Sequence, residues 1–263
     1  LKAYDGDLGK NAEVFYNITR GNEDRAFGIF PDGFLYIAKE LDRETKDIYK
    51  LTVLATDKGV PPRSSECNVT IYIMDENDNK PIFLNAAYNM SVNENAPLKS
   101  YVGKVNASDA DMGRNGEISY FLSSAQNDFS IDVETGEIFT AKQFDRELLF
   151  ETTGRNYITF DVIAKDNGIK RLQAMTPVKV YIEDVNDNSP QFNKSVYDVS
   201  VSEDAAMFTS IAEIRAYDKD TGINALLTYR IVNGNTDDKF EINSFTGQLS
   251  RKQGLLDRET EDH

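Results

Sequence analysis

The chain of 263 residues has little of the chemistry on which many enzymes depend. It contains one cysteine, Cys67, one histidine, His263, and no tryptophan. An internal disulfide framework, an imidazole metal site and a Ser-His-Asp or Cys-His catalytic set are therefore excluded. Basic residues are also few, because 29 Lys and Arg stand against 44 Asp and Glu. The net charge of −15 disfavours nucleic acid and anionic lipid as partners.

Long apolar runs are missing as well. No stretch approaches the roughly 18 residues of a membrane-spanning helix, and no leader-like segment opens the sequence, so we expect an internal piece of a longer protein. Hydrophobic residues make up 40% of the chain, which is typical of folded domains, and the length allows two or three of them. In CNVTIYIM, Cys67 alternates in phase with Val69 and Ile71. This favours a buried thiol on the core face of a strand over an intermolecular bridge.

An internal repeat organises the rest of the sequence. The segment DENDNKPIF (75–83) returns 109 residues later as DVNDNSPQF (184–192). A second motif occurs three times. It has Asp, Asp, Gly, Asn and Tyr at identical spacing in YDGDLGKNAEVFY (4–16), SDADMGRNGEISY (108–120) and YDKDTGINALLTY (217–229). Such a period indicates one structural unit used several times. We predict one complete domain between two partial ones, with bounds 1–79, 80–188 and 189–263.

The pattern within each unit is that of a β protein. Segments such as EISYFL, GEIFTA and YITFDVIAKD are short, rich in β-branched and aromatic residues, and separated by Gly, Asn and Asp turns. No window of about 12 residues shows a helical stripe. Seven or so strands in a unit of this length predict an all-β, immunoglobulin-like Greek-key sandwich. The insertion at 147–157 in the middle unit has no functional interpretation from sequence.

Acidic residues recur in pairs at the ends of the units. In an extended segment residues i and i+2 point the same way, so Asp109 and Asp111 should share a side, as should Asp145 and Glu147, with Arg146 pointing elsewhere. Carboxylates held so close repel one another unless a cation joins them. Oxygen ligands of this kind suit Ca²⁺ better than Zn²⁺ or Mg²⁺. One such pair fits an Asx turn equally well, but recurrence at fixed intervals favours a metal site.

Taken together, LDRE, DADMGRNG, AKDNG, NENAP and DENDNKP resemble the calcium motifs of cadherin extracellular repeats, and the resemblance covers essentially the whole chain. It implies tandem sandwich domains of cadherin type, joined end to end into a curved rod by calcium-binding linkers. It also implies about three Ca²⁺ at each complete junction. The repeated polar segments, 75–83 and 184–192, would then be the interdomain linkers, with their oxygen atoms facing the metals.

The resemblance implies ligands from both sides of each linker. At the first junction they are Asp42, Glu44, the Glu76 backbone, Asn77, Asp78, the Asn79 carbonyl, Asp109, Asp111, the Asn115 carbonyl and Asp166. At the second they are Glu94, Asp145, Glu147, the Val185 carbonyl, Asn186, Asp187, the Asn188 carbonyl, Asp218, Asp220 and the Asn224 carbonyl. Two half-sites, expected to be poorly occupied, comprise Asp5, Asp7, Asn11 and Asp57, and Glu203, Asp257 and Glu259. Three divalent ions would neutralise the carboxylates of each junction.

The implied function is calcium-dependent cell-cell adhesion by the ectodomain of a single-pass membrane protein, on the extracellular side of the plasma membrane. The partner would be another cadherin ectodomain, of the same or a different type, on an apposed or the same cell. Membrane anchoring would come only from parts outside this chain. Five glycosylation sequons agree with an extracellular address, at Asn17, Asn68, Asn89, Asn106 and Asn193.

Two other functions remain to be weighed. The repeats could be spacer or force-bearing elements of a receptor whose adhesive surface lies elsewhere. Family members that adhere by strand swapping rely on a Trp in the outermost repeat, and this chain has none. Paired carboxylates also serve glycoside hydrolases, but here the same pairs recur in every unit rather than forming one unique constellation. We therefore predict that the chain is not an enzyme.

Overall fold

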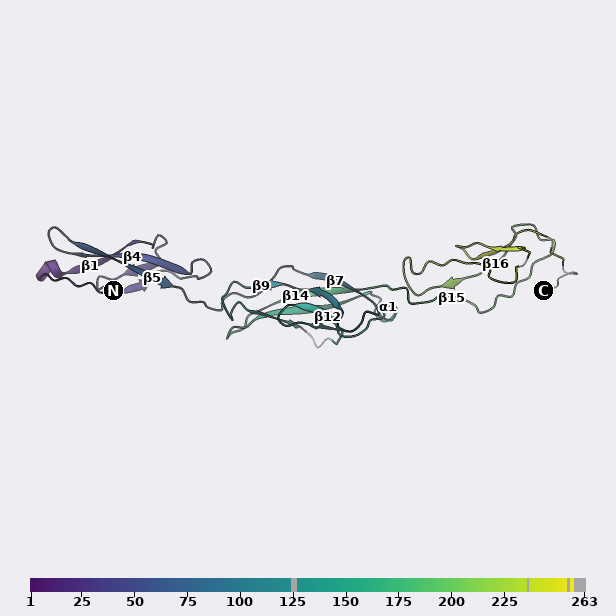
Figure 1. Ribbon diagram of the computed structural model, residues 1–263, viewed down its shortest axis with the longest axis horizontal. Helices are drawn as coiled ribbons and strands as arrows, with labels where there is room; N and C mark the ends of the chain where they lie inside the picture. Colours follow the sequence, from purple (N-terminus) through teal and green to yellow (C-terminus); the bar gives the residue numbers. More distant parts are fainter. Residues whose placement is uncertain (124–126, 236, 255, 258–263) are drawn as a thin grey trace.

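The computed structural model describes residues 1–123, 127–235, 237–254 and 256–257. Three strand-rich units follow one another in line, so the chain forms an elongated rod with the N-terminal unit at one end and the C-terminal unit at the other (Figure 1). Extended segments join the units. Among the described residues, no helix is long and apolar enough to cross a membrane.

The first unit packs a three-stranded antiparallel sheet against a hairpin. A short helix η1 precedes the sheet, whose order is β1-β4-β5, and β2 pairs with β3. Phe27 and Tyr49 meet edge to face at 4.9 Å in its small core, beside buried Leu51. The bounds are η1 Gly9–Ala12, β1 Val14–Arg20, β2 Phe27–Ile29, β3 Leu35–Ile37, β4 Ile48–Asp57 and β5 Ser64–Tyr72.

The middle unit is a sandwich of a four-stranded sheet, β10-β13-β14-β7, and a three-stranded sheet, β11-β12-β8, with β6 and β9 paired at one end. Alternate residues of β13 and β14 are buried, which gives the inward face of a two-layer core. In that core Phe129 stacks on Phe144 and packs against Phe160, both at 5.1 Å. The bounds are β6 Ile82–Phe83, β7 Tyr88–Asn93, β8 Tyr101–Lys104, β9 Ala107–Ser108, β10 Ile118–Leu122, β11 Phe129–Ile131, β12 Glu137–Thr140, β13 Tyr157–Asp166 and β14 Gln173–Glu183.

The third unit repeats part of this plan. The pair β15 and β17 corresponds to β6 and β9, and the sheet β16-β19-β18 corresponds to β8-β12-β11. Apolar side chains such as Leu226 and Val232 are 74% and 72% exposed, so little of a core forms among the described residues of this unit. The bounds are β15 Gln191–Phe192, β16 Ser210–Glu213, β17 Ala216–Tyr217, β18 Phe240–Ile242 and β19 Gln248–Arg251.

One helix departs from the predicted strand pattern. Helix α1 (Arg146–Thr153) occupies most of the insertion at 147–157. Asp145 caps its N-terminus by accepting the Leu148 N–H at 2.7 Å, and Gly154 ends it in the left-handed conformation at φ 68°. Asp145 and Glu147 are therefore not two residues of an extended segment, and that prediction is wrong. They sit instead at the cap and in the first turn of α1.

Cys67 is exposed, so the prediction of a buried thiol is also wrong. At the equivalent position of the middle unit, Thr176 is 2% exposed and its hydroxyl donates to the Asn85 carbonyl oxygen at 3.4 Å. Asn85 precedes β7, which pairs with the outer edge of β14. In the part of the chain that the structure describes, β5 is an edge strand without such a neighbour. Cys67 does lie on the same face of β5 as Val69 and Ile71, but among the described residues no segment covers that face near Cys67.

Candidate metal centre

At the first junction the structure brings together acidic groups from three places in the sequence. Glu44 follows the last strand of the hairpin, Asp78 lies in the linker, and Asp111 lies in the loop after β9 of the middle unit. One carboxylate oxygen from each lies within 4.8 Å of the others. The predicted convergence of both domains and the linker is thus present in the geometry.

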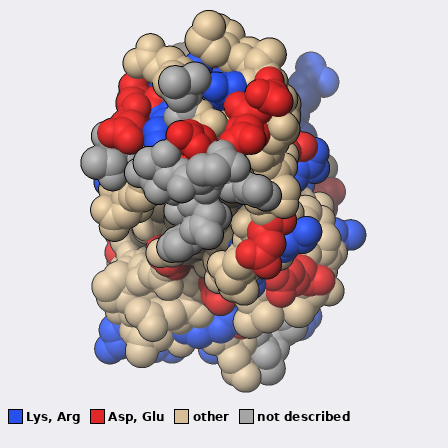
Figure 2. Space-filling model, turned by 90° about the vertical axis from the view of Figure 1, so that its right-hand side faces the viewer, with Lys and Arg blue, Asp and Glu red and all other residues tan. Residues whose placement is uncertain are grey.

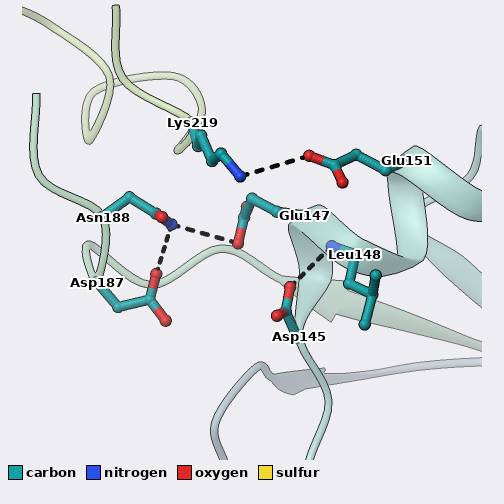
Figure 3. A pocket seen from close by; sticks show the side chains of 7 residues that line it. All are labelled: Asp145, Glu147, Leu148, Glu151, Asp187, Asn188 and Lys219. Carbon is teal, nitrogen blue, oxygen red and sulfur yellow. Dashed lines mark hydrogen bonds and ion pairs between the residues drawn. The ribbon is translucent and has the colours of Figure 1, made fainter. Parts of the chain in front are cut away.

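The second junction repeats this arrangement. Oxygens of Glu147, Asp187 and Asp220 also lie within 4.8 Å of one another, at the positions that correspond to Glu44, Asp78 and Asp111. Glu147 and Asp187 border an open cleft of about 250 Å³. In the close-up, Glu147 projects from the start of α1 toward the linker (Figure 3). The same fold therefore builds the same acidic cluster twice.

Local turns hold the paired carboxylates. The Asp111 N–H donates to Asp109 Oδ1 at 3.0 Å, and the Asp220 N–H donates to Asp218 Oδ1 at the same distance. These are Asx-type turns rather than extended segments, which corrects the geometry expected for Asp109 and Asp111. The turn still places both carboxylates at the junction. Half-buried Asp109 and buried Asp111 belong to the same cluster of side chains around the linker.

The last asparagine of each linker joins linker to loop through its side chain. Asn79 donates from Nδ2 to Asp78 and Asp111, both at 2.8 Å. Asn188 donates to Asp187 at 2.8 Å and to Asp220 at 2.7 Å (Figure 3 shows the first of these). The sequence had predicted only a backbone carbonyl role for these two residues. Their amide groups offset part of the repulsion between neighbouring carboxylates.

Buried oxygen atoms without a donor test whether a cation fits. Asn77 donates from Nδ2 to the Lys170 carbonyl oxygen at 2.6 Å and to Asp166 at 3.2 Å, which leaves its Oδ1 buried and without a donor. Asp109 Oδ2 is likewise buried without a partner. Buried acceptors are rarely left unsatisfied in folded proteins. An oxygen-only set with two such atoms fits a hard cation such as Ca²⁺.

The pKa values of two cluster carboxylates also favour a cation site. Burial raises the pKa of Asp109, with the nearby charges of Asp111 and Asp166 adding to the effect. Burial also raises the pKa of Glu147, where the Arg146 hydrogen bond opposes it and the Glu94 charge adds to it. In both cases the charged form is disfavoured by its surroundings. A cation would stabilise that charged form.

Glu94 anchors the second junction from the middle unit. It is 2% exposed, and its carboxylate accepts the Arg146 N–H and the Val185 N–H, both at 2.8 Å. One side chain at the end of β7 thus holds the start of α1 and the linker. An oxygen of Glu94 also lies within 4.8 Å of oxygens of Glu147 and Asp184.

The arginines of the first two Asp-Arg-Glu motifs, Arg43 and Arg146, lie among the acidic groups of their junctions, which corrects the prediction that Arg146 points elsewhere. Arg146 Nη1 lies 3.1 Å from Glu147 Oε1 and 3.3 Å from Asp184 Oδ1. Arg43 pairs in the same way with Glu44 and with Asp75, whose Oδ1 lies 2.5 Å from Arg43 Nε. The long side chain folds back toward the acidic groups, which backbone alternation cannot predict.

The first Asp of each linker is a residue that sequence reasoning missed. Asp75 and Asp184 open DENDN and DVNDN, yet neither was predicted to have a role. Each contacts the arginine of the unit before the linker and the loop of the unit after it. Their recurrence at the same repeat position was the available signal.

Most of the described carboxylates of the half-sites are exposed. Asp57 is 5% exposed and accepts the N–H groups of Gly59 and Arg63, whereas the side chains of Asp5, Asp7 and Asn11 are exposed. Glu203 and Asp257 are exposed, and Glu259 lies outside the described residues. In the second linker Asn186 is exposed, whereas Asn77 in the first is half-buried. Exposure alone does not separate Asn186 from the cluster, because Asp78 and Asp187 are exposed too.

The remaining predicted positions differ in exposure. Glu76 has an exposed side chain, and Asn115 and Asn224 lie half-buried in their loops. All five sequon asparagines, at 17, 68, 89, 106 and 193, are exposed. Viewed from the C-terminal end, acidic side chains form several separate groups on the surface, with tan and blue residues between them (Figure 2).

Gly168 keeps space open beside the first linker. A Cβ there would lie 2.5 Å from Asn77 Nδ2 and 2.8 Å from Asn115 Oδ1, although the backbone is outside the left-handed region. We expect Gly168→Ala to displace Asn77 and to lower calcium affinity at the first junction about tenfold, measured by calorimetric titration. Gly59→Ala is the matched control, because its Cβ would meet Asp57 Oδ1 only at 3.1 Å. Equal calcium affinities for the two variants would contradict this account of Gly168.

Comparison with known proteins places these features in a family. The family model of the cadherin domain matches residues 1–74, 88–183 and 197–263. The chain is 44% identical over 251 residues to protocadherin Fat 4 of Homo sapiens, an alignment that covers 95% of the chain and 5% of that protein. It is 38% identical over 276 residues to protein dachsous of Drosophila melanogaster, covering 98% of the chain and 8% of that protein. The chain thus spans a small part of these relatives.

Solved structures agree with the arrangement of the units. Protocadherin Gamma B2 extracellular cadherin domains 3-6 match with a TM-score of 0.83 at 30% identity, over 97% of this chain and 62% of that one. Mouse cadherin-23 EC22-24 matches with a TM-score of 0.72 at 30% identity, over 97% and 80%. The predicted all-β fold is confirmed, and so is the prediction that the chain is not an enzyme, since cadherin-domain proteins are adhesion proteins. The chain belongs to the cadherin family and consists of tandem cadherin repeats.

Proposed function

We propose that this chain is a calcium-rigidified segment of an adhesion receptor ectodomain, in which Ca²⁺ binds at both junctions between neighbouring repeats. The observation that carries the proposal is the pair of buried, unpartnered oxygens, Asn77 Oδ1 and Asp109 Oδ2, one from the linker and one from the next repeat. Only a cation or water satisfies such atoms, and the surrounding groups are nearly all carboxylates. A divalent cation resolves both the unsatisfied atoms and the repulsion.

Charge balance supports several ions per junction. The predicted ligands of the first junction include six carboxylates, from Asp42, Glu44, Asp78, Asp109, Asp111 and Asp166. The charges of Arg43 and Asp75 were left out of that sum, and they cancel because the two side chains form an ion pair. The formal charge that calcium must balance is therefore unchanged. About three divalent ions would neutralise it, as the family resemblance implies.

Residues from both repeats and from the linker would together fix the orientation of the junction. Bound calcium supplies positive charge and oxygen coordination at the junction. Glu44, Asp78 and Asp111 belong to three separate segments, so shared attachment to cations would fix the linker and both repeats in one orientation. Extracellular sites of this kind bind at roughly 10⁻⁴ to 10⁻³ M, and so fill outside cells. The rod would be stiff there and hinged where calcium is absent.

The cellular setting follows from the family and from the surface. We propose an extracellular location, in a protein anchored to the plasma membrane by parts outside this chain. Exposure of all five sequon asparagines supports glycosylation there. We place the repeat boundaries at 79/80 and 188/189, because each linker carries ligands for both neighbours. The partner would be another cadherin ectodomain, on the same or an apposed cell.

A second candidate is a spacer or force-bearing role. The chain spans 5% to 8% of the matched relatives, which supports a position inside a long array of repeats. In that case calcium would still stiffen the rod, but recognition would lie in other repeats. Beads coated with the chain should aggregate in calcium if these repeats adhere, and should stay dispersed if they act only as spacers.

Calorimetric titration tests the calcium proposal itself. We expect binding at about millimolar calcium or tighter, with the stoichiometry reduced in Asp78→Asn, whose carboxylate belongs to the first cluster. The half-site variant Asp5→Asn should leave the titration almost unchanged, because Asp5 is exposed and away from both junctions. Absence of heat and of any change on chelation would refute calcium binding.

A further inference from the structure

Three of the five sequon asparagines lie on the same kind of sheet. Asn17 is on β1 and Asn68 is on β5, in the sheet β1-β4-β5 of the first unit. Asn89 is on β7, in the corresponding sheet β10-β13-β14-β7 of the middle unit. Asn106 and Asn193 lie outside these sheets, and none of the five lies on β2, β3, β8, β11 or β12. The sequons are therefore distributed unevenly between the two sheets of a repeat.

The three strand asparagines are on the outer faces of their sheets. On each strand the sequon asparagine is exposed and the residue after it is half-buried. Successive side chains of a strand point to opposite faces, so the asparagines point away from the core. The hydroxyl residues that complete the three sequons are exposed as well, namely Thr19, Thr70 and Ser91. Both parts of each sequon are thus accessible.

The two sequons of the first unit share one surface. Asn17 lies opposite Leu54 of β4, and Asn68 lies opposite Thr52 of the same strand. Thr52 Oγ1 donates to Asn68 Oδ1 at 3.1 Å, which engages the amide oxygen, whereas a sugar is attached to the amide nitrogen. Directly opposed residues are about 5 Å apart. Glycans on Asn17 and Asn68 would therefore stand in neighbouring rows of the sheet, on either side of Leu54.

Phe15 lies beside Asn17 on the outer face of β1. Its side chain is 44% exposed, although a large apolar ring gains free energy when it leaves water. Two positions along a strand span about 7 Å, which is short enough for a sugar on Asn17 to fold back over the ring. The face of an aromatic ring is electron-rich and attracts the C–H groups of a sugar. Phe15 is therefore placed to support the first sugar.

Asn89 has aromatic neighbours across the strand pair. It lies opposite Lys179 of β14, and Ser91 lies opposite Tyr181. The rings of Tyr181 and Tyr157 meet at 5.7 Å, and Lys179 Nζ lies 4.5 Å from the centre of the Tyr157 ring. These three side chains are half-buried on the outer face of the sheet. A glycan on Asn89 would stand directly beside them.

Exposed aromatic residues also occur near the strands that carry no sequon, and they provide an internal comparison. Phe34, which precedes β3, is 69% exposed, and Tyr101 on β8 is 58% exposed. Both belong to the smaller sheets, on the other side of the core from the sequon strands. Their accessibility should not depend on sugars attached to the larger sheets.

We propose that N-linked glycans on Asn17, Asn68 and Asn89 cover the outer faces of the sheets β1-β4-β5 and β10-β13-β14-β7, with Phe15 in contact with the sugar on Asn17. In the attachment step the asparagine amide nitrogen loses a proton and bonds to the anomeric carbon of an oligosaccharide, and the lipid pyrophosphate that carried the sugar leaves. The inference rests on the extracellular location proposed above. Because N-glycans are bulky, the cover closes these faces to a partner ectodomain.

Hydroxyl-radical footprinting of the full chain, secreted from mammalian cells, tests the cover at Asn17. The variants Asn17→Gln and Thr19→Ala both remove the sequon, but they alter different side chains. Oxidation of Phe15 should become several-fold faster in both variants, while oxidation of Phe34 stays unchanged. An equal Phe15 rate with and without the glycan would overturn the proposal, as would an unaltered chain that carries no sugar on any one of the three asparagines by mass spectrometry.

Asn89→Gln applies the same test to the middle unit. Oxidation of Tyr181 should become faster, while that of Tyr101 stays unchanged, and an unchanged Tyr181 rate would contradict the cover on this unit. Thermal unfolding of each variant is the folding control, because all the substitutions are on exposed side chains. Calcium titration of the same samples keeps the two proposals apart. If the chain bound no calcium, the calcium proposal would fail, yet the Phe15 and Tyr181 rates would still decide the cover.

Discussion

Asp166→Ala should weaken calcium binding at the first junction by at least ~10-fold and destabilise the middle repeat by ~2–4 kcal/mol. Asp166 is fully buried, and its carboxylate accepts the N–H groups of Gly168 at 2.9 Å and Leu172 at 2.6 Å. It also accepts Asn77 Nδ2 at 3.2 Å. Alanine leaves buried donors unpaired and removes a predicted ligand. Calcium titration and chemical denaturation in chelator measure the two effects separately.

The chain supplies a matched control at the equivalent position of the first repeat. Asp57 is 5% exposed and accepts the N–H groups of Gly59 at 2.8 Å and Arg63 at 3.0 Å. Asp57→Ala should therefore cost the first repeat similar stability, because it breaks the same two hydrogen bonds. Calcium affinity at the two complete junctions should not change. If Asp166→Ala lost stability but kept the calcium affinity of the unaltered chain, Asp166 would be a structural residue only.

Glu94→Ala should destabilise the middle repeat by ~3 kcal/mol or more and weaken calcium binding at the second junction. Glu94 is 2% exposed and ties β7 to both α1 and the linker through the N–H groups of Arg146 and Val185. Loss of the carboxylate leaves those two donors unsatisfied and frees the start of α1, where Glu147 lies. Thermal unfolding in chelator reports the first effect, and calcium titration reports the second.

Glu203 occupies the position equivalent to Glu94 in the third repeat, but its side chain is exposed. Glu203→Ala should change stability by no more than about 0.5 kcal/mol. The comparison holds residue type and repeat position constant while the surroundings differ. Equal effects of the two substitutions would mean that the contacts of Glu94 do not stabilise the repeat.

The repeat was predictable because the same motifs recur along the sequence. The strand pattern was predictable because strands and turns depend on residues close together in the sequence. Period-two alternation in β13 and β14 marks buried faces, and glycine and asparagine turns mark strand ends. The convergence of Glu44, Asp78 and Asp111 was predictable only through the family resemblance, since the three residues come from separate segments. Spacing alone indicated pairs, not a cluster.

The errors have different physical origins. Cys67 alternates like a core residue, but no described strand covers its face. The segment after Asp145 becomes a helix because a cap and a left-handed Gly154 favour it locally, although its apolar residues form no clear stripe. Arg146 reaches the cluster through a flexible side chain, so its backbone direction says little about its contacts.

The ion pair between Lys219 and Glu151 was predictable neither from the sequence pattern nor from the family resemblance. The two side chains meet at 3.6 Å across the second junction, joining α1 to the loop of the third repeat (Figure 3). Both are about half exposed, at 48% and 61%, so the pair contributes little to stability. Ala110 takes the place of Lys219 at the first junction. The two junctions therefore differ at their surface while their buried contacts repeat.

Small-angle scattering with and without calcium tests most directly whether a divalent cation locks neighbouring repeats end to end. With calcium at a few millimolar, the maximum dimension should match the extended arrangement of the three units in Figure 1, with a narrow distribution of lengths. In excess chelator we expect a shorter average dimension and a broader distribution, as the junctions bend. Identical scattering profiles in both conditions would contradict the account, whatever the chain's affinity for calcium.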